Sequence, residues 1–271
     1  MESCRRPAVA GQFYYSSKEQ LLTQIEKLIF QPPKKIDAVA CLLPHAGYMY
    51  SGAVAGHTVS SLNIKDKVIL LGPNHTGYGT QFSIMTEGTW QTPLGEIKID
   101  SALARQILKR CDLLKNDYMA HLYEHSLEVE LPFLQYFKFD FQIVPIAFLS
   151  ADVDALKQIG EAIALTIKEM NLTGSTLIVA SSDMTHYEPQ EQAQKKDKQA
   201  IEAILELNED KLIERIKKLD ISMCGFAPAI AMISAAKKLG ANKATLVKYQ
   251  TSGDITGDKS SVVGYAGIVI Y

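Results

Sequence analysis

The chain has 271 residues, of which 47% are hydrophobic, and its 28 basic and 30 acidic side chains give a formal net charge of -2. Because there is no basic excess, we expect neither nucleic acid nor an anionic membrane surface as a partner. No apolar run approaches the roughly 20 residues of a membrane span, and the start of the chain lacks the apolar core of a signal peptide. Four scattered cysteines without a CxxC pair predict a cytoplasmic protein with free thiols.

Helical and strand patterns mostly alternate along the chain. A first helix is expected to begin near Ser17, whose hydroxyl can cap it, with Gln20 completing a capping box. Continuous apolar runs, typical of strands covered on both faces, occupy Ala38–Leu43, Val68–Leu71, Ile143–Ala147 and Leu177–Ala180. Helical spacing is found in Ala53–Leu62, Ala102–Arg110, Leu127–Phe137, Val153–Met170, Gln190–Leu207, Asp210–Leu219 and Ala227–Leu239. Further strands are expected at Ala244–Tyr249 and Val262–Ile270, and a strand pair at Phe82–Met85 and Glu96–Asp100.

These elements predict an α/β fold with a mostly parallel or mixed central sheet and helices on both faces, in one domain of residues 1–271. In open α/β sheets, ligands bind beyond the carboxyl ends of the strands. Three apolar strands end in a polar loop that contains a histidine: CLLPHAGY with His45, GPNHTG with His75, and SSDMTHY with Asp183 and His186. Because parallel strands end on one side of a sheet, we expect these loops to meet.

A single histidine after a strand is more often a loop residue or a hydrogen-bonded core residue than a ligand. Three at the same structural position favour a shared site, because histidine is the commonest metal ligand and an acid or base near neutral pH. His125 is expected at the start of a helix, pointing into the same crevice. Glu128 lies three residues further on, and we expect it to support a metal ligand or to pack the helix rather than to bind a metal itself.

Cys224 precedes Gly225 and an apolar helix, and two interpretations of it stay open. A thiol at a helix N-terminus tends to have a lowered pKa and to be a better ligand or nucleophile. Most free cysteines, in contrast, are small buried apolar residues. Among the tyrosines, Tyr48 is the one expected to contact a substrate, because it lies three residues from His45.

Taken together, the blocks PHAGYMYSG, GPNHTG, EHSLEVELPFLQ, SSDMTHY and MCGFAPA resemble the Memo family, where they occur in the same order. The resemblance runs from about Pro7 to Tyr271. The family is similar in fold to the class III extradiol ring-cleaving dioxygenases. Those enzymes hold Fe(II) with two histidines and a glutamate, and use a further histidine as acid and base.

The resemblance implies that His45 and His75 are the imidazole ligands of a metal and that Cys224 takes the place of the glutamate. It also implies that Asp183 and His186 are polar pocket residues with a catalytic role. His125 falls where the dioxygenases keep a histidine that contacts the substrate.

The cysteine departs from the dioxygenase pattern and changes the metals that the site favours. Two histidines and a carboxylate suit non-haem Fe(II) and oxygen, whereas two histidines and a thiolate suit copper and also zinc. Members of the Memo family are reported to bind copper or iron. The resemblance therefore implies Fe(II) or copper, with zinc as the third candidate.

Three functions are compatible with these residues. The first is a metal-dependent redox enzyme of the dioxygenase type with a small, aromatic substrate, in which His186 moves protons and is oriented by Asp183 or a backbone carbonyl. The second is a zinc-type hydrolase with His186 or Glu128 as the base. The third is a peptide-binding module, since family members are described as phosphotyrosine-peptide binders. The resemblance also implies a radical-SAM protein as a partner, because the family is found beside one in microbes.

Overall fold

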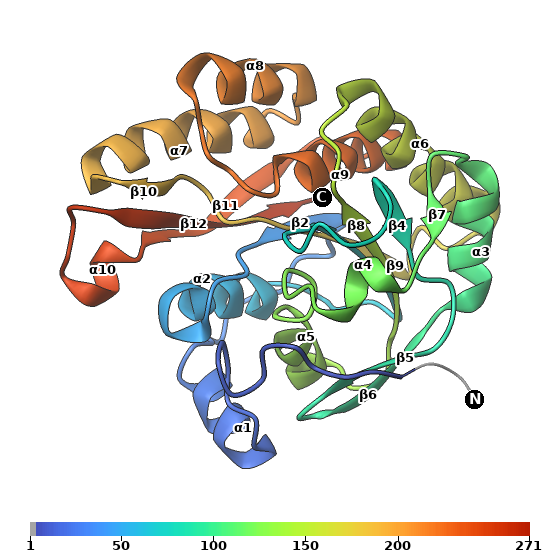
Figure 1. Ribbon diagram of the computed structural model, residues 1–271, viewed down its shortest axis with the longest axis horizontal. Helices are drawn as coiled ribbons and strands as arrows, with labels where there is room; N and C mark the ends of the chain where they lie inside the picture. Colours follow the sequence, from blue (N-terminus) through green and yellow to red (C-terminus); the bar gives the residue numbers. More distant parts are fainter. Residues whose placement is uncertain (1–3) are drawn as a thin grey trace.

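The computed structural model describes residues 4–271, and its centre is a twelve-stranded sheet (Figure 1). Its main path has the order β1-β5-β6-β8-β3-β9-β2-β12-β10. The strands are β1 (Cys4–Arg5), β2 (Ala40–Leu43), β3 (Lys67–Pro73), β4 (Phe82–Ile84), β5 (Thr89–Thr92), β6 (Gly95–Ile99), β7 (Lys115–Asn116), β8 (Gln142–Phe148), β9 (Thr176–Ser181), β10 (His186–Glu188), β11 (Ala244–Thr251) and β12 (Val262–Ile270). The helices are α1 (Lys18–Glu26), α2 (Tyr48–Ser60), α3 (Ser101–Arg110), α4 (Met119–Leu122), α5 (Leu131–Phe137), α6 (Val153–Glu169), α7 (Gln190–Leu205), α8 (Glu209–Leu219), α9 (Phe226–Leu239) and α10 (Gly253–Thr256).

Four neighbouring parallel strands, in the order β8-β3-β9-β2, form the middle of the sheet. Apart from the first residues of β3 and β8, all of their residues are buried. Burial on both faces explains why these segments are continuous apolar runs, and the four expected strands are confirmed. β12 pairs antiparallel with β2, and β10 and β11 pair antiparallel with β12, so the sheet as a whole is mixed.

Helices cover both faces of this sheet, which confirms the expected α/β fold. α6 and α9 pack against each other, and α9 also contacts β2, β3 and β9. α2 contacts β2, β11 and β12 and packs against α5. In Figure 1, α6, α8 and α9 lie above the sheet, whereas α1, α2 and α5 lie below it. The expected cap of α1 by Ser17 is confirmed, because Oγ of Ser17 accepts the N–H of Gln20 at 3.3 Å. Among the described residues, the reciprocal hydrogen bond from the Ser17 N–H to the Gln20 side chain, which would complete a capping box, is not found.

Two helices begin at other residues than expected. α5 begins at Leu131 rather than Leu127, because residues 126–130 form turns, and Pro132 occupies its first turn, where no N–H is needed. His125 therefore lies in an irregular segment and not at the start of a helix.

α2 begins five residues earlier than expected, at Tyr48. It includes Gly52, where an added side chain would collide with Leu28.

The expected pairing of 82–85 with 96–100 is wrong. The hairpin around the turn at Thr92–Gly95 is formed by β5 and β6, which pair antiparallel. β4 instead lies antiparallel to β8 and parallel to the short β7. β5 alternates half-buried or exposed residues with buried ones, a pattern that fits a strand with one solvated face.

A buried ion pair anchors the N-terminal segment to the irregular segment before α5. The carboxylate of Glu128 accepts a hydrogen bond from Nη1 of Arg5 at 2.5 Å, from the N–H groups of Ala8 and Val9 at 2.7 and 3.0 Å, and from the hydroxyl of Tyr14 at 2.5 Å. Both charged side chains are fully buried. Glu128 therefore holds the N-terminal segment, rather than packing a helix or supporting a metal ligand as expected, and its four hydrogen bonds leave it no capacity to act as a general base.

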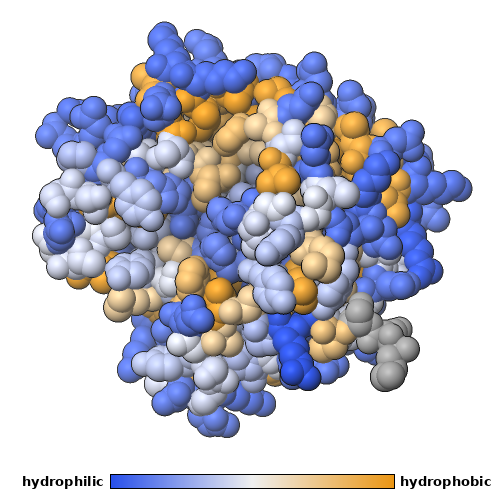
Figure 2. Space-filling model, viewed as in Figure 1, coloured by the Kyte–Doolittle hydropathy of each residue, from blue (hydrophilic) through white to orange (hydrophobic). Residues whose placement is uncertain are grey.

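Within residues 4–271, no helix combines the length and the apolar character that crossing a membrane requires. In Figure 2, hydrophilic side chains dominate the outline of the molecule, whereas hydrophobic ones gather nearer its middle.

Replacing Glu128 by glutamine should lower the free energy of unfolding by about 3–5 kcal/mol, because it leaves the Arg5 charge buried and uncompensated. The matched control is Glu87→Gln, which breaks the Arg105–Glu87 pair, where both side chains are more than 60% exposed. That change should cost less than about 1 kcal/mol. Urea unfolding at pH 7 measures both, and equal losses in the two variants would contradict the anchoring role of Glu128.

Candidate metal centre

Three adjacent parallel strands each place a polar residue at the same level, just beyond the carboxyl end of the strand. β3, β9 and β2 are neighbours in that order and run parallel. His75, Asp183 and His45 each lie two residues beyond the last residue of their strand. The expectation that these loops converge beyond the carboxyl ends of the strands is confirmed.

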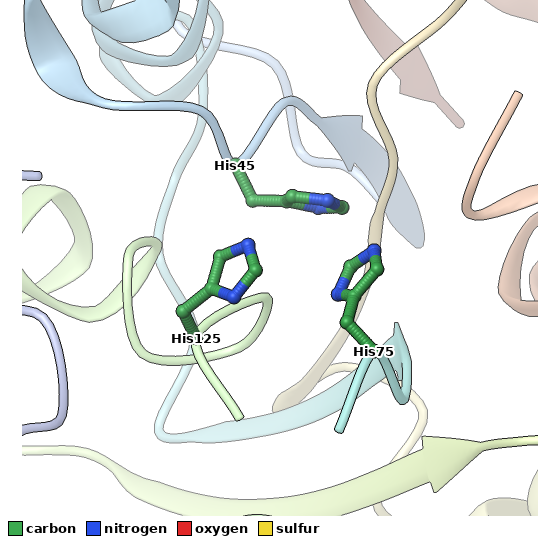
Figure 3. Close-up of side chains that lie close together, drawn as sticks. All are labelled: His45, His75 and His125. Carbon is green, nitrogen blue, oxygen red and sulfur yellow. The ribbon is translucent and has the colours of Figure 1, made fainter. Parts of the chain in front are cut away.

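Three histidine rings meet there (Figure 3). One ring nitrogen from each of His45, His75 and His125 lies within 4.8 Å of the other two. The ring centroids of His45 and His75 are 5.3 Å apart, and those of His75 and His125 are 4.9 Å apart and nearly stacked. Three imidazoles that share so small a volume can bind a metal ion.

The carboxylate of Glu124 is hydrogen-bonded to two of these histidines. Its Oε1 lies 2.9 Å from Nδ1 of His75 and accepts the N–H groups of His125 at 3.0 Å and Ser126 at 2.9 Å, and its Oε2 accepts the N–H of His75. The bond to Nδ1 leaves Nε2 of His75 free, as in the carboxylate–histidine pairs of metal sites. This role of Glu124 was missed, although a carboxylate directly before His125 was its signal in the sequence.

The Glu124–His75 pair shifts the pKa of both groups. Burial disfavours both charges, but the hydrogen bond from His75 lowers the pKa of Glu124 to about 2. The same hydrogen bond, working against burial, raises the pKa of His75. Both shifts favour an anionic Glu124, which strengthens His75 as an electron donor to a metal.

His45 is held by a different set of contacts. Its Nδ1 lies 2.7 Å from Oγ of Ser181, and its backbone N–H donates to Oδ1 of Asp183 at 2.9 Å. Burial, together with the neighbouring His125 and His75, keeps its pKa well below the ordinary value. His45 is therefore a neutral imidazole, the form that binds metals.

Cys224 lies beside His45, with its Sγ 3.3 Å from Nε2 of that ring. Two donor atoms of one tetrahedral ion lie about 3.5 Å apart, given bonds of roughly 2.0 to 2.3 Å, so the pair fits a shared ion. Among the described residues, however, the group whose ligand atoms all lie within 4.8 Å consists of the three histidines and does not include Cys224. Burial and the nearby Asp183 raise the pKa of the thiol, so of the two interpretations left open for Cys224 the one with a lowered pKa does not hold here.

Asp183 and His186 are not partners of each other. Nδ1 of His186 lies 2.8 Å from the backbone carbonyl of Ser222, which was one of the two expected orienting groups. Asp183 instead accepts the N–H of His45, and burial raises the pKa of its carboxyl to about 6 even though that bond favours the anion.

A cavity of about 950 Å³ opens above these residues. All six residues expected at the site line it, namely His45, His75, His125, Asp183, His186 and Cys224. Their individual roles as ligands or catalytic groups stay predictions.

The expectation that Tyr48 contacts a substrate is wrong. Its ring is buried and stacks on Phe133, and its hydroxyl donates to the carbonyl of Val129 at 2.8 Å. It points away from the cavity because it begins α2, whereas Tyr50, two residues on, lines the cavity. Tyr187 and Tyr265 line the cavity as well.

The carboxylate of Glu124 should make stability depend on pH in a defined window. Because folding lowers its pKa from 4.5 to about 2, its stabilisation is fully present above pH 4.5 and is lost as the pH falls towards 2. At pH 7, Glu124→Gln should be less stable than the parent by roughly 3 kcal/mol, taking 1.36 kcal/mol per pKa unit. Urea unfolding at several pH values measures this difference, and a difference that stays constant from pH 7 to about 2.5 would contradict the assignment.

Comparisons with known proteins agree with the resemblance seen in the motifs. A family model described as "Memo-like protein" matches residues 5–269. A MEMO1 family protein of Methanopyrus kandleri is 44% identical over 98% of both chains, and one of Methanocaldococcus jannaschii is 44% identical over 100% of both. A MEMO1 family protein of Aquifex aeolicus is 45% identical over 98% of both chains.

Among solved structures, the crystal structure of an uncharacterised protein from Escherichia coli K12 is similar, with a TM-score of 0.58. The match covers 85% of this chain and 98% of that one at 14% sequence identity, so it is a likeness of fold alone. The family model and the relatives at 44–45% identity cover nearly the whole chain. This protein therefore belongs to the Memo family.

Proposed function

We propose that this protein is a metal-dependent redox enzyme of the dioxygenase type that acts on a small aromatic substrate. The observation that supports this most is the convergence of ring nitrogens from three histidines, of which His45 is buried, at the base of a cavity of about 950 Å³. Bound iron or copper would supply Lewis-acid and one-electron chemistry. A dioxygenase places both atoms of O₂ in its substrate, so no external reductant is needed.

His45, His75 and Cys224 are the proposed ligands, and iron or copper is the proposed metal, with zinc as the third candidate. The contact between Sγ of Cys224 and Nε2 of His45 supports this set, because the two atoms are close enough to share an ion. His125 is then left to contact the substrate. Burial lowers its pKa, so it faces the cavity as a neutral ring that can accept a hydrogen bond from a substrate hydroxyl.

His186 is the proposed acid and base. Since a backbone carbonyl can only accept, the contact with Ser222 places the proton of the neutral ring on Nδ1 and leaves Nε2 as a base. His186 lines the cavity, where it can reach a substrate proton. Asp183, whose pKa lies near 6, is proposed to take up or release a proton beside the metal ligands.

The other two functions have less support. Glu128, one of the two bases considered for a hydrolase, already accepts four hydrogen bonds from the N-terminal segment.

Among the described residues that line the cavity, none is a lysine or an arginine. Phosphate recognition commonly uses arginine forks or a helix N-terminus. The N-terminus of α2, with Gly47 as its N-cap, borders the cavity, but the absence of arginine forks leaves a phosphotyrosine peptide with less support. A radical-SAM protein as a partner stays a prediction.

Oxygen dependence tests the proposed reaction class. Protein loaded with Fe(II) without air should consume O₂ in the presence of catechol-like substrates, and product should not form under argon. An oxygen electrode and product analysis provide the measurement. Turnover of a substrate that continues unchanged under argon would identify a hydrolase instead.

In the same assay, His186→Ala should retain its metal and lose about 100- to 10,000-fold in turnover, the usual contribution of a positioned acid or base. The control is His57→Ala, which changes a histidine in α2 that lies against the ring of Phe30 and does not line the cavity. It should leave turnover unchanged. Loss of metal from His186→Ala would show that His186 is a ligand.

The third ligand can be identified by comparing Cys224→Ser with His125→Ala. Losing an outer partner of a ligand costs 10- to 100-fold in metal affinity, so losing Cys224 itself should cost more than about 100-fold. His125→Ala should bind the metal with less than about a 10-fold loss. Competition with a chelator under anaerobic conditions measures both, and the reverse ranking would assign the third position to His125.

A further inference from the structure

Three short contacts meet at one hydroxyl group beneath His45. Oγ of Ser181 lies 2.7 Å from Nδ1 of His45, 2.7 Å from the backbone carbonyl oxygen of Ser126, and 2.8 Å from Oε1 of Glu130. Ser181 and Glu130 are both fully buried. The hydrogen bonds of this cluster must therefore be made among the Ser181 hydroxyl and its three partners.

Counting donors leaves one arrangement that satisfies all three contacts. A serine hydroxyl has one proton to donate and two lone pairs that accept. The carbonyl of Ser126 can only accept, so the proton of Ser181 goes to it. The other two contacts then need protons from the partners of Ser181. His45 must carry its proton on Nδ1, and Glu130 must be protonated on Oε1.

The surroundings of Glu130 favour its neutral form. Its Oε2 has no hydrogen-bond partner, and among residues 4–271 no ion pair involves this carboxyl. An ionised carboxylate buried without compensation is very costly, whereas a neutral acid is not. Burial accordingly raises the pKa of Glu130 well above its ordinary value. Glu128, also fully buried but held by Arg5 and three further donors, shows what an ionised glutamate in this segment requires.

We propose that Ser181 and a neutral Glu130 are positioning residues that hold His45 with its proton on Nδ1, so that the lone pair of Nε2 faces the cavity. This inference rests on the proposed function, because it describes how one ligand is prepared for its metal. Glu130 donates to the second lone pair of Ser181 and so keeps the serine proton on the carbonyl of Ser126. The serine can then accept from His45 but cannot donate to it.

The two proposed histidine ligands therefore receive opposite kinds of support. An anionic carboxylate, Glu124, holds His75, whereas a neutral hydroxyl and a neutral acid hold His45. Because an anionic partner raises the basicity of a ligand histidine, His75 is expected to be the stronger donor. A neutral Glu130 also avoids charge repulsion with the nearby Asp183.

Nitrogen NMR of the metal-free protein tests the tautomer directly. With ¹⁵N-labelled histidine at pH 7, His45 is identified by the signal that His45→Gln lacks. It should be protonated on Nδ1 and unprotonated on Nε2. Ser181→Ala should shift it towards the Nε2-protonated form. Thr166→Val, which removes a buried hydroxyl in α6, should not. A parent His45 protonated on Nε2, or no change in Ser181→Ala, would overturn the proposal.

Infrared difference spectroscopy tests the state of Glu130. At pH 7, the parent should show a band of a protonated carboxyl group that Glu130→Gln lacks. Loss of a carboxylate band instead would overturn the proposal.

Metal affinity should fall about 10- to 100-fold in Ser181→Ala. It should be unchanged in Glu130→Gln, because the amide donates the same hydrogen bond. If the parent binds no metal, the proposed function fails, while the NMR and infrared results still decide this inference.

Discussion

The parallel alignment of β3, β9 and β2 is the constraint on which the site depends. The register pairs Leu71 with Ala180 and Leu43 with Ser181, so the three strands end almost level. His75, Asp183 and His45 follow at equal distances and reach the same space. Because side chains alternate between the two faces of a strand, a shift by one residue would move every side chain to the opposite face of the sheet. Both faces of these strands are buried, which specifies the register strongly.

The segment Glu124–Glu130 connects this sheet edge to the rest of the molecule. Its three glutamates are all buried, and each has a different environment. Glu124 is an anion held by His75, Glu128 is paired with Arg5, and Glu130 contacts Ser181. Turns rather than a helix allow this, since in a helix residues four apart would share one face. The same segment thus supports two histidines of the site, anchors the N-terminal residues and closes the space beneath His45.

Much of the fold and the membership of the site could be predicted from the sequence. The central strands are continuous apolar runs that need no tertiary information to be recognised, and strand ends in parallel sheets meet by geometry. The start of α5 could not be predicted, because residues 127–130 keep helical spacing while buried contacts such as Arg5–Glu128 hold them in turns. The direction of Tyr48 and the pKa of Cys224 depend on burial by segments distant in the chain. Glu124 was missed as a support for His75 because the two residues lie 49 positions apart.

The central claim is that His45 and His75 hold a metal ion together with Cys224. The most direct measurement is elemental analysis of protein purified without oxygen, beside a variant that combines His45→Ala, His75→Ala and Cys224→Ser. The account predicts near-stoichiometric iron or copper in the parent and none in the variant. If neither protein contained metal, even after anaerobic loading, the metalloenzyme account would be contradicted and the cavity would be a binding surface.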